Sequence, residues 1–207
     1  MSLKERLLER PIVYETFHFI FSKEKLSHLT TYLRSRKSHR LLNVLDLGCG
    51  PGTNARLFTD STKYNYLGID LNPSYIEIAR RKYHLKFECA DITQLIREQG
   101  RFDLVLVNSV LHHLNNAAAG TVLRSAREVL AAEGECVVLD MIFPRQRSWS
   151  TSLQRWLIRC DRGDFCRTVE NLEQLVSVHF CPVSVVAFSI RIAGIILWDL
   201  RLIVCRL

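Results

Sequence analysis

The chain has 207 residues, of which 48% are hydrophobic and 24% charged, with a formal net charge of +7. This size and composition are those of one ordinary globular domain, and they exclude an intrinsically disordered or fibrous protein. Seven cysteines without a C-x-x-C pair argue against a disulfide framework and a zinc site, so we expect no metal.

Residues 1–40 come first and are predicted to be helical, because Leu26, Leu29 and Leu33 recur at helical spacing. Pro11 is expected to separate a short first helix from the next one. The charged start lacks the apolar stretch of a secretory signal, so we expect a cytoplasmic protein.

Short apolar runs and helical stretches alternate from residue 42 onward. The expected strands are residues 42–47, 65–70, 85–89, 102–108 and 135–140, and the clearest helices between them are residues 74–83 and 121–130. Such alternation predicts an α/β fold with an open parallel sheet covered by helices on both faces.

Residues 184–190 and 197–205 are two β-rich runs with no helix between them, which predicts an antiparallel pair that finishes the sheet. A membrane anchor is the alternative, because residues 183–207 are mostly apolar. However, Arg191, Asp199 and Arg201 interrupt the stretch, and we therefore expect no transmembrane segment.

Residues 44–52 (VLDLGCGPG) join the end of the first expected strand to a glycine-rich turn and a helix expected near Thr53. Glycines allow a tight turn and let a ligand approach the main chain closely. A dinucleotide-binding loop requires Gly or Ala at position 53, and a P-loop ends in G-K-[S/T]. Neither pattern is present, which argues against NAD and ATP.

This motif resembles the first motif of the class I SAM-dependent methyltransferases, and the resemblance continues over residues 42–140. It implies a Rossmann-like, seven-stranded, mostly parallel sheet with an antiparallel C-terminal hairpin. We expect a single domain spanning residues 1–207. Within it, residues 1–40 form a helical lid, 41–140 the core that binds S-adenosyl-L-methionine (SAM), 141–182 a substrate-side insertion and 183–207 the hairpin.

The resemblance assigns the SAM-binding residues. In the first motif they are Asp46, Gly48, Cys49, Gly50 and Gly52, with the methionine part expected closest to Gly48. Asp46 is expected to accept loop N–H groups or to reach the SAM amino group through water.

Asp70 is expected to accept both ribose hydroxyls and Leu71 to cover the adenine. Capping of the helix near Ser74 is an alternative role for Asp70.

Later strands supply further expected contacts. Asp91 and Ile92 are assigned to the adenine, although Asp91 is also placed to cap a helix near Ile92. The backbone of Asn108 and Ser109 is assigned to the methionine moiety. His112 and His113 follow; we expect a structural role for each first, and if one of them acts as a catalytic base, His113 is the preferred candidate.

Candidate contacts outside the core are fewer. Tyr14 and His18 lie one helical turn apart and are candidates for cofactor and substrate contacts respectively, with core packing as the alternative. Arg162 and Arg167 are candidates for holding an anionic substrate group, with a surface ion-pair cluster as the alternative.

The expected reaction is transfer of the SAM methyl group to an O, N or C nucleophile of a small metabolite, leaving S-adenosyl-L-homocysteine. An RNA or tRNA methyltransferase is one alternative, because residues 1–40 and 145–167 carry net charges of +5 and +4. We do not favour nucleic acid, since no basic stretch is interleaved with aromatics. A catalytically silent SAM-fold binding protein is the other alternative.

Overall fold

The structure is a computed structural model that describes residues 11–36, 38–94, 101–145, 149–160 and 164–207. Its residues fall into two units, 1–37 and 38–207, and the boundary lies close to the end of the expected lid. In the first unit, α2 (Pro11–Ser35) is one continuous helix. Pro11 is its first residue, a position where a missing N–H costs nothing.

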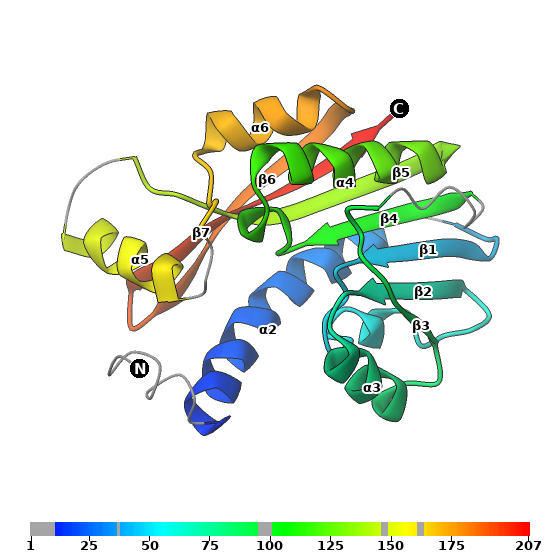
Figure 1. Cartoon of the computed structure of the whole chain (residues 1–207), viewed down its shortest axis with the longest axis horizontal. Coiled ribbons are helices and arrows are strands. Elements are labelled where there is room, and N and C mark those ends of the chain that lie inside the picture. The colour runs from blue at the N-terminus through cyan, green and yellow to red at the C-terminus, as the bar shows by residue number, and fades with distance from the viewer. Residues whose placement is uncertain (1–10, 37, 95–100, 146–148, 161–163) are drawn as a thin grey trace. The chain divides into compact units, whose positions relative to one another are not determined.

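The second unit is built on a sheet in which seven strands are described, in the order β3-β2-β1-β4-β5-β7-β6 (Figure 1). The strands are β1 (Leu42–Leu47), β2 (Tyr64–Asp70), β3 (Lys86–Cys89), β4 (Phe102–Asn108), β5 (Leu130–Ile142), β6 (Cys181–Ile192) and β7 (Ile195–Arg206). Strands β1 to β5 pair in parallel, while β7 runs antiparallel to both β5 and β6. This is the expected Rossmann-like topology with its C-terminal hairpin.

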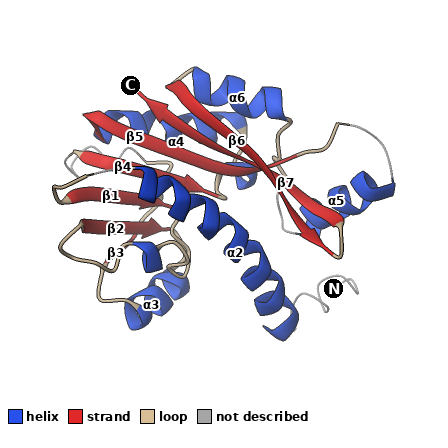
Figure 2. Ribbon diagram, turned by 180° about the vertical axis from the view of Figure 1, so that it is seen from behind, coloured by secondary structure: helices blue, strands red, loops and turns tan. Residues whose placement is uncertain are grey.

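The connections carry the helices η1 (Ala55–Leu57), α3 (Pro73–Lys82), η2 (Leu111–His113), α4 (Asn116–Val129), α5 (Trp149–Cys160) and α6 (Val169–Ser177). Figure 2 shows α5 beside one end of the β6–β7 hairpin and α6 near the other. Helices α4 and α6 lie side by side, and α4 also packs on β5.

The core lies between the central strands and α4. All residues of β4 except Asn108 are buried, as the continuous apolar run of a parallel strand requires. The inward side of α4 adds buried Val122, Leu123 and Ala126 to the same hydrophobic cluster. Apolar packing therefore holds the carboxyl ends of β1 and β4 in place.

Several expected elements differ from the structure. Strands β5, β6 and β7 are longer than the expected residues 135–140, 184–190 and 197–205. The helix expected near Thr53 is only the short 3-10 turn η1. Helix α4 begins earlier than expected, at Asn116, because the Asn115 side chain caps it by accepting a hydrogen bond from the N–H of Ala118. Among the described helices, none combines the length and the apolar character needed to cross a bilayer.

Candidate functional site

The carboxyl ends of β1, β2, β3 and β4 meet at one edge of the sheet. Strand β1 lies between β2 and β4, and β2 pairs with β3. The chain leaves β1 toward β2 and later returns to β4 on the other side, which makes this a topological switch point. Residues 48–52, 70–71, 91–92 and 108–109 all follow these strand ends, so the fold brings the core candidates to one edge.

The glycine-rich loop has a conformation that ordinary side chains disfavour. Gly48, Gly50 and Gly52 have φ angles of 74°, 54° and 81°. At the start of the loop, the N–H groups of Gly48 and Cys49 donate to the Ile69 carbonyl at 2.8 and 3.0 Å. These bonds tie the turn to β2.

Gly48 and Gly50 face different surroundings. A Cβ on Gly48 would lie 2.4 Å from Cγ2 of Val110, so a side chain there would collide with the protein. A Cβ on Gly50 would have no heavy atom within 4 Å. The loop is therefore open on the side of the Gly50 Cα, and the expected closest ligand contact at Gly48 stays a prediction.

Asp70 connects this loop to the end of β2. Its Oδ2 accepts the N–H of Gly50 at 2.8 Å, and its Oδ1 accepts the N–H of Asn72 at 2.8 Å. Asn72 itself caps α3, its side chain accepting from the N–H of Ser74. Capping was the alternative role for Asp70, and Asn72 performs it. Leu71 follows with 66% of its surface exposed at the same edge.

Asp46 is fully buried, and its carboxylate meets two residues that we had not predicted. The Asn54 side-chain amide donates to both of its oxygens at 3.2 Å, and the Tyr66 hydroxyl donates at 2.8 Å. Burial raises the Asp46 pKa to about 6, against the lowering effect of those bonds. The expected loop N–H contacts are replaced by the Asn54 side chain. Asn54 and Tyr66 were missed because neither belongs to a sequence motif.

The same network continues to β4. The Asn108 amide donates to Oδ1 of Asn54 at 2.8 Å, and the Ser109 hydroxyl donates to Oδ1 of Asn108 at 3.1 Å. Ser109 has a φ of 59°, and its N–H donates to the Leu139 carbonyl at 2.8 Å. The strained turn at Ser109 therefore ends β4 beside the glycine-rich loop.

Asp91 forms a local turn after β3. Its Oδ1 accepts the N–H of Thr93 at 2.9 Å and the Thr93 hydroxyl at 2.7 Å, and these bonds lower its pKa. Ile92 is buried. Most of the helix that Asp91 was placed to cap would fall in residues 95–100, outside the described residues.

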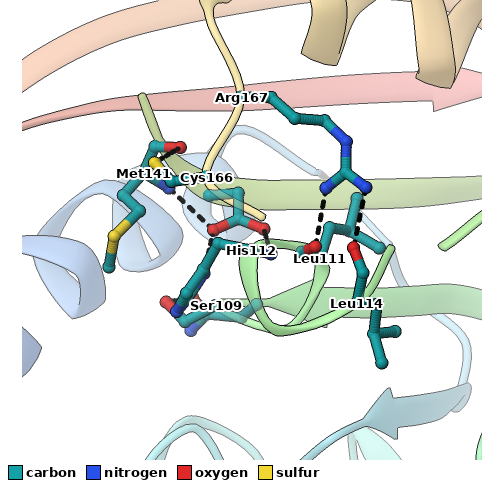
Figure 3. Close-up of polar contacts among 9 residues, drawn as sticks. Ser109, Leu111, His112, Leu114, Met141, Cys166 and Arg167 are labelled. Carbon is teal, nitrogen blue, oxygen red and sulfur yellow. Dashed lines mark hydrogen bonds and ion pairs between the residues drawn. The ribbon is translucent and has the colours of Figure 1, made fainter. Parts of the chain in front are cut away.

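The two histidines differ sharply. His112 is buried, and its ring Nδ1 pairs with Oδ1 of Asp140 (Figure 3). Its backbone N–H donates to Oδ2 of the same carboxylate at 3.1 Å. His113 is exposed, and its ring lies 4.0 Å from that of His112, centroid to centroid. His112 therefore has the expected structural role, and His113 is the histidine that solvent reaches.

Arg167 is bound to the segment that follows β4. Its guanidinium donates to the carbonyls of Leu111 and Leu114 at 2.6 and 2.8 Å (Figure 3). Its Nε donates to the Asn116 side chain at 3.0 Å. Burial lowers its pKa. These contacts hold Arg167 within the fold, and the expected substrate contact stays a prediction.

Three other candidates fall outside the description. Arg162 lies in an undescribed segment, and the side chains of Tyr14 and His18 are likewise outside the described part of α2. Within the described residues, no group of three or more His, Cys, Asp or Glu is arranged to hold a metal ion.

The sequence is similar to known methyltransferases over part of its length. Residues 44–134 match a family described as a methyltransferase domain. The malonyl-[acyl-carrier protein] O-methyltransferase of Bacillus anthracis is 26% identical over 159 residues, covering 74% of this chain and 57% of that protein. The trans-aconitate 2-methyltransferase of Methylobacterium nodulans is 36% identical over 100 residues, covering 47% and 37%. The chain thus covers less than two thirds of the length of either curated relative.

Solved structures share the fold. The N-methyltransferase NodS of Bradyrhizobium japonicum, solved with S-adenosyl-L-homocysteine, aligns with a TM-score of 0.66 and 21% identity over 89% of this chain and 86% of its own. Magnesium protoporphyrin IX methyltransferase of Synechocystis aligns with a TM-score of 0.68 and 14% identity over 95% and 85%. Residues 44–134 thus resemble a methyltransferase domain over less than half of the chain, and the chain shares the fold of these solved methyltransferases.

Proposed function

We propose that this chain binds SAM at the carboxyl edge of its sheet and transfers the methyl group to a nucleophile of a small metabolite. The observation that carries this proposal is the pairing of Gly50 with Asp70. An open stretch of main chain and a carboxylate lie side by side, joined by one 2.8 Å hydrogen bond. Such a pair suits a ligand that combines an aminoacyl chain with a ribose.

The described residues fit SAM in three respects. The space beside Gly50 accommodates a ligand against bare backbone. Each Asp70 oxygen accepts one protein N–H, which leaves lone pairs for the ribose hydroxyls. Leu71 offers an exposed apolar surface to an adenine ring, and Asp91 follows the neighbouring strand at the same edge.

Bound SAM would supply an activated methyl group on a sulfonium ion. The protein would hold the acceptor in line with that group, exclude water and, where needed, remove a proton. Exposed His113 is our candidate for the proton acceptor, because buried His112 is engaged with Asp140. The acceptor is proposed as an O, N or C atom of a small molecule, as in the methyltransferases named above.

The test has two measurements on the full chain. Calorimetry with S-adenosyl-L-homocysteine should show saturable binding, and incubation with methyl-labelled SAM and a metabolite extract should label a small molecule. Absence of binding would reject the SAM site. Binding with label only in RNA or lipid would retain the site and reject the acceptor class.

A further inference from the structure

Helix α5 presents an unusual outward stripe. Every third or fourth residue along it is exposed, and these residues are Trp149, Ser152, Trp156 and Arg159. Trp149 is 72% exposed and Trp156 is 54% exposed. Large aromatic side chains are rarely left this open without a partner.

The opposite side of α5 anchors it to the sheet. Leu157 and Ile158 are buried, and the Gln154 amide approaches the Ile196 carbonyl at 3.5 Å and Oδ2 of Asp199 at 3.4 Å. Helix α5 therefore packs against the start of β7, beside the tip of the β6–β7 hairpin (Figures 1 and 2). Because the apolar side of α5 packs on β7, Trp149 and Trp156 lie on its outward side.

The hairpin tip adds apolar surface. Ala193 and Gly194 form the turn, with φ angles of 49° and 81°, as a tight two-residue hairpin requires. Ile192 and Ile195 pair directly across it and are 42% and 36% exposed. We call Trp149, Trp156, Ile192 and Ile195, with the exposed Arg159 and Arg191, the tryptophan corner.

The charged residues included in this corner, Arg159 and Arg191, are both positive. Nearby Asp199 is half-buried and accepts a 2.6 Å hydrogen bond from Ser189. Neither residues 149–160 nor residues 181–198 contain an Asp or Glu, whereas Arg159 and Arg191 are exposed. Tryptophan rings favour the boundary between water and hydrocarbon, and arginines beside them attract anionic lipid headgroups. We propose that the tryptophan corner docks this protein on the surface of a bilayer containing anionic phospholipid.

A second copy of the chain is a poorer occupant. Symmetric contact would bring arginines near arginines, and neither segment supplies an acidic partner. The proposed contact is peripheral, since none of the described helices is able to cross a membrane.

The test uses the fluorescence of the full chain, which has three tryptophans. Trp198 is buried and serves as an internal reference. Vesicles of phosphatidylcholine with phosphatidylglycerol should shift the emission to shorter wavelength and sediment the protein, and salt should weaken both effects. Pure phosphatidylcholine vesicles should do neither.

Variants locate the contact. Trp149→Ala with Trp156→Ala should weaken vesicle binding at least about tenfold and leave an emission, from Trp198 alone, that vesicles do not shift. Arg159→Ala should weaken binding about fivefold. Val178→Ala and Arg124→Ala, which change exposed residues elsewhere, should bind as the parent does.

Equal binding by the double tryptophan variant, or equal binding to both kinds of vesicle, would overturn the proposal. So would a concentration-dependent blue shift without vesicles, which would assign the corner to a second copy. The assay contains no SAM, so its outcome is separate from that of the proposed methyl transfer.

Discussion

The N–H of Gly50 donates a 2.8 Å hydrogen bond to Oδ2 of Asp70 and thereby joins the glycine-rich loop after β1 to the carboxylate that ends β2. Twenty residues separate the two along the chain, and the parallel pairing of β1 with β2 brings them together. The proposed ribose acceptor thus also holds the loop against which the aminoacyl chain is proposed to lie.

Asp70→Ala should therefore weaken binding of S-adenosyl-L-homocysteine by about 1–3 kcal/mol, the usual scale for losing hydrogen bonds to a charged group. Calorimetry measures the change. Asp60→Ala is the matched control, because Asp60 is an exposed acid at the opposite end of β2. Unchanged affinity in Asp70→Ala would remove the carboxylate from the binding site.

Gly48 should resist substitution for a steric reason that involves one neighbour. In Gly48→Ala the new Cβ meets Cγ2 of Val110 at 2.4 Å, and the left-handed φ adds about 1–2 kcal/mol. Val110→Ala removes that methyl group. Urea unfolding of the two single variants and the double variant should show a favourable coupling of about 1 kcal/mol or more.

Gly50→Ala provides the comparison, since its Cβ would enter open space. Gly50→Ala should lower the free energy of unfolding only by the cost of placing alanine at a left-handed φ. It should also weaken binding of S-adenosyl-L-homocysteine. If the effects of Gly48→Ala and Val110→Ala on the unfolding free energy add without coupling, the predicted collision does not occur.

The sequence predicted the strands well because buried parallel strands are short, apolar runs ended by turn residues. Strand β4 matched its expected bounds, 102–108, because its apolar run is continuous. Helix α4 began earlier than expected because the stretch after Asn115 is rich in small residues with little helical periodicity, and only the cap marks its start.

The site was predictable where a motif determines backbone geometry and not where side chains meet across the sheet. The three glycines have the positive φ angles that their loop requires. By contrast, Asn54 and Tyr66 contact Asp46 only in the folded protein, and nothing in their local sequence indicates it. The contacts of Arg167 with two carbonyls were also not predictable, because a buried arginine and an exposed one look the same in sequence.

Asp46 should make stability depend on pH between about 4 and 6. Its folded pKa is about 6, above the ordinary value of 3.8, so the folded protein binds this proton more tightly than the unfolded chain. The contribution of Asp46 to the free energy of unfolding should be fully present below pH 4 and should be lost as the pH rises through 6, by at most about 3 kcal/mol.

Asp46→Asn removes the ionisation and is the matched variant. The difference in unfolding free energy between the parent and Asp46→Asn should therefore change over that pH range and be constant above it. Urea titrations at closely spaced pH values measure it, and a constant difference from pH 4 to 7 would contradict the raised pKa.

Arg167 should be important for folding and not for ligand affinity. Its guanidinium satisfies the carbonyls of Leu111 and Leu114, and Arg167→Ala would leave these buried acceptors without their donor. The expected loss is about 2–4 kcal/mol of unfolding free energy in urea. Arg167→Lys should recover little of this loss, because an ammonium group cannot reproduce the fork that spans both carbonyls.

Affinity for S-adenosyl-L-homocysteine, measured on the folded variants, should stay within about twofold of the parent. Arg124→Ala, an exposed arginine on α4, is the control for loss of charge alone. A stable Arg167→Ala protein that binds S-adenosyl-L-homocysteine as the parent does, but transfers less methyl label to the small-molecule acceptor, would instead support the expected substrate contact.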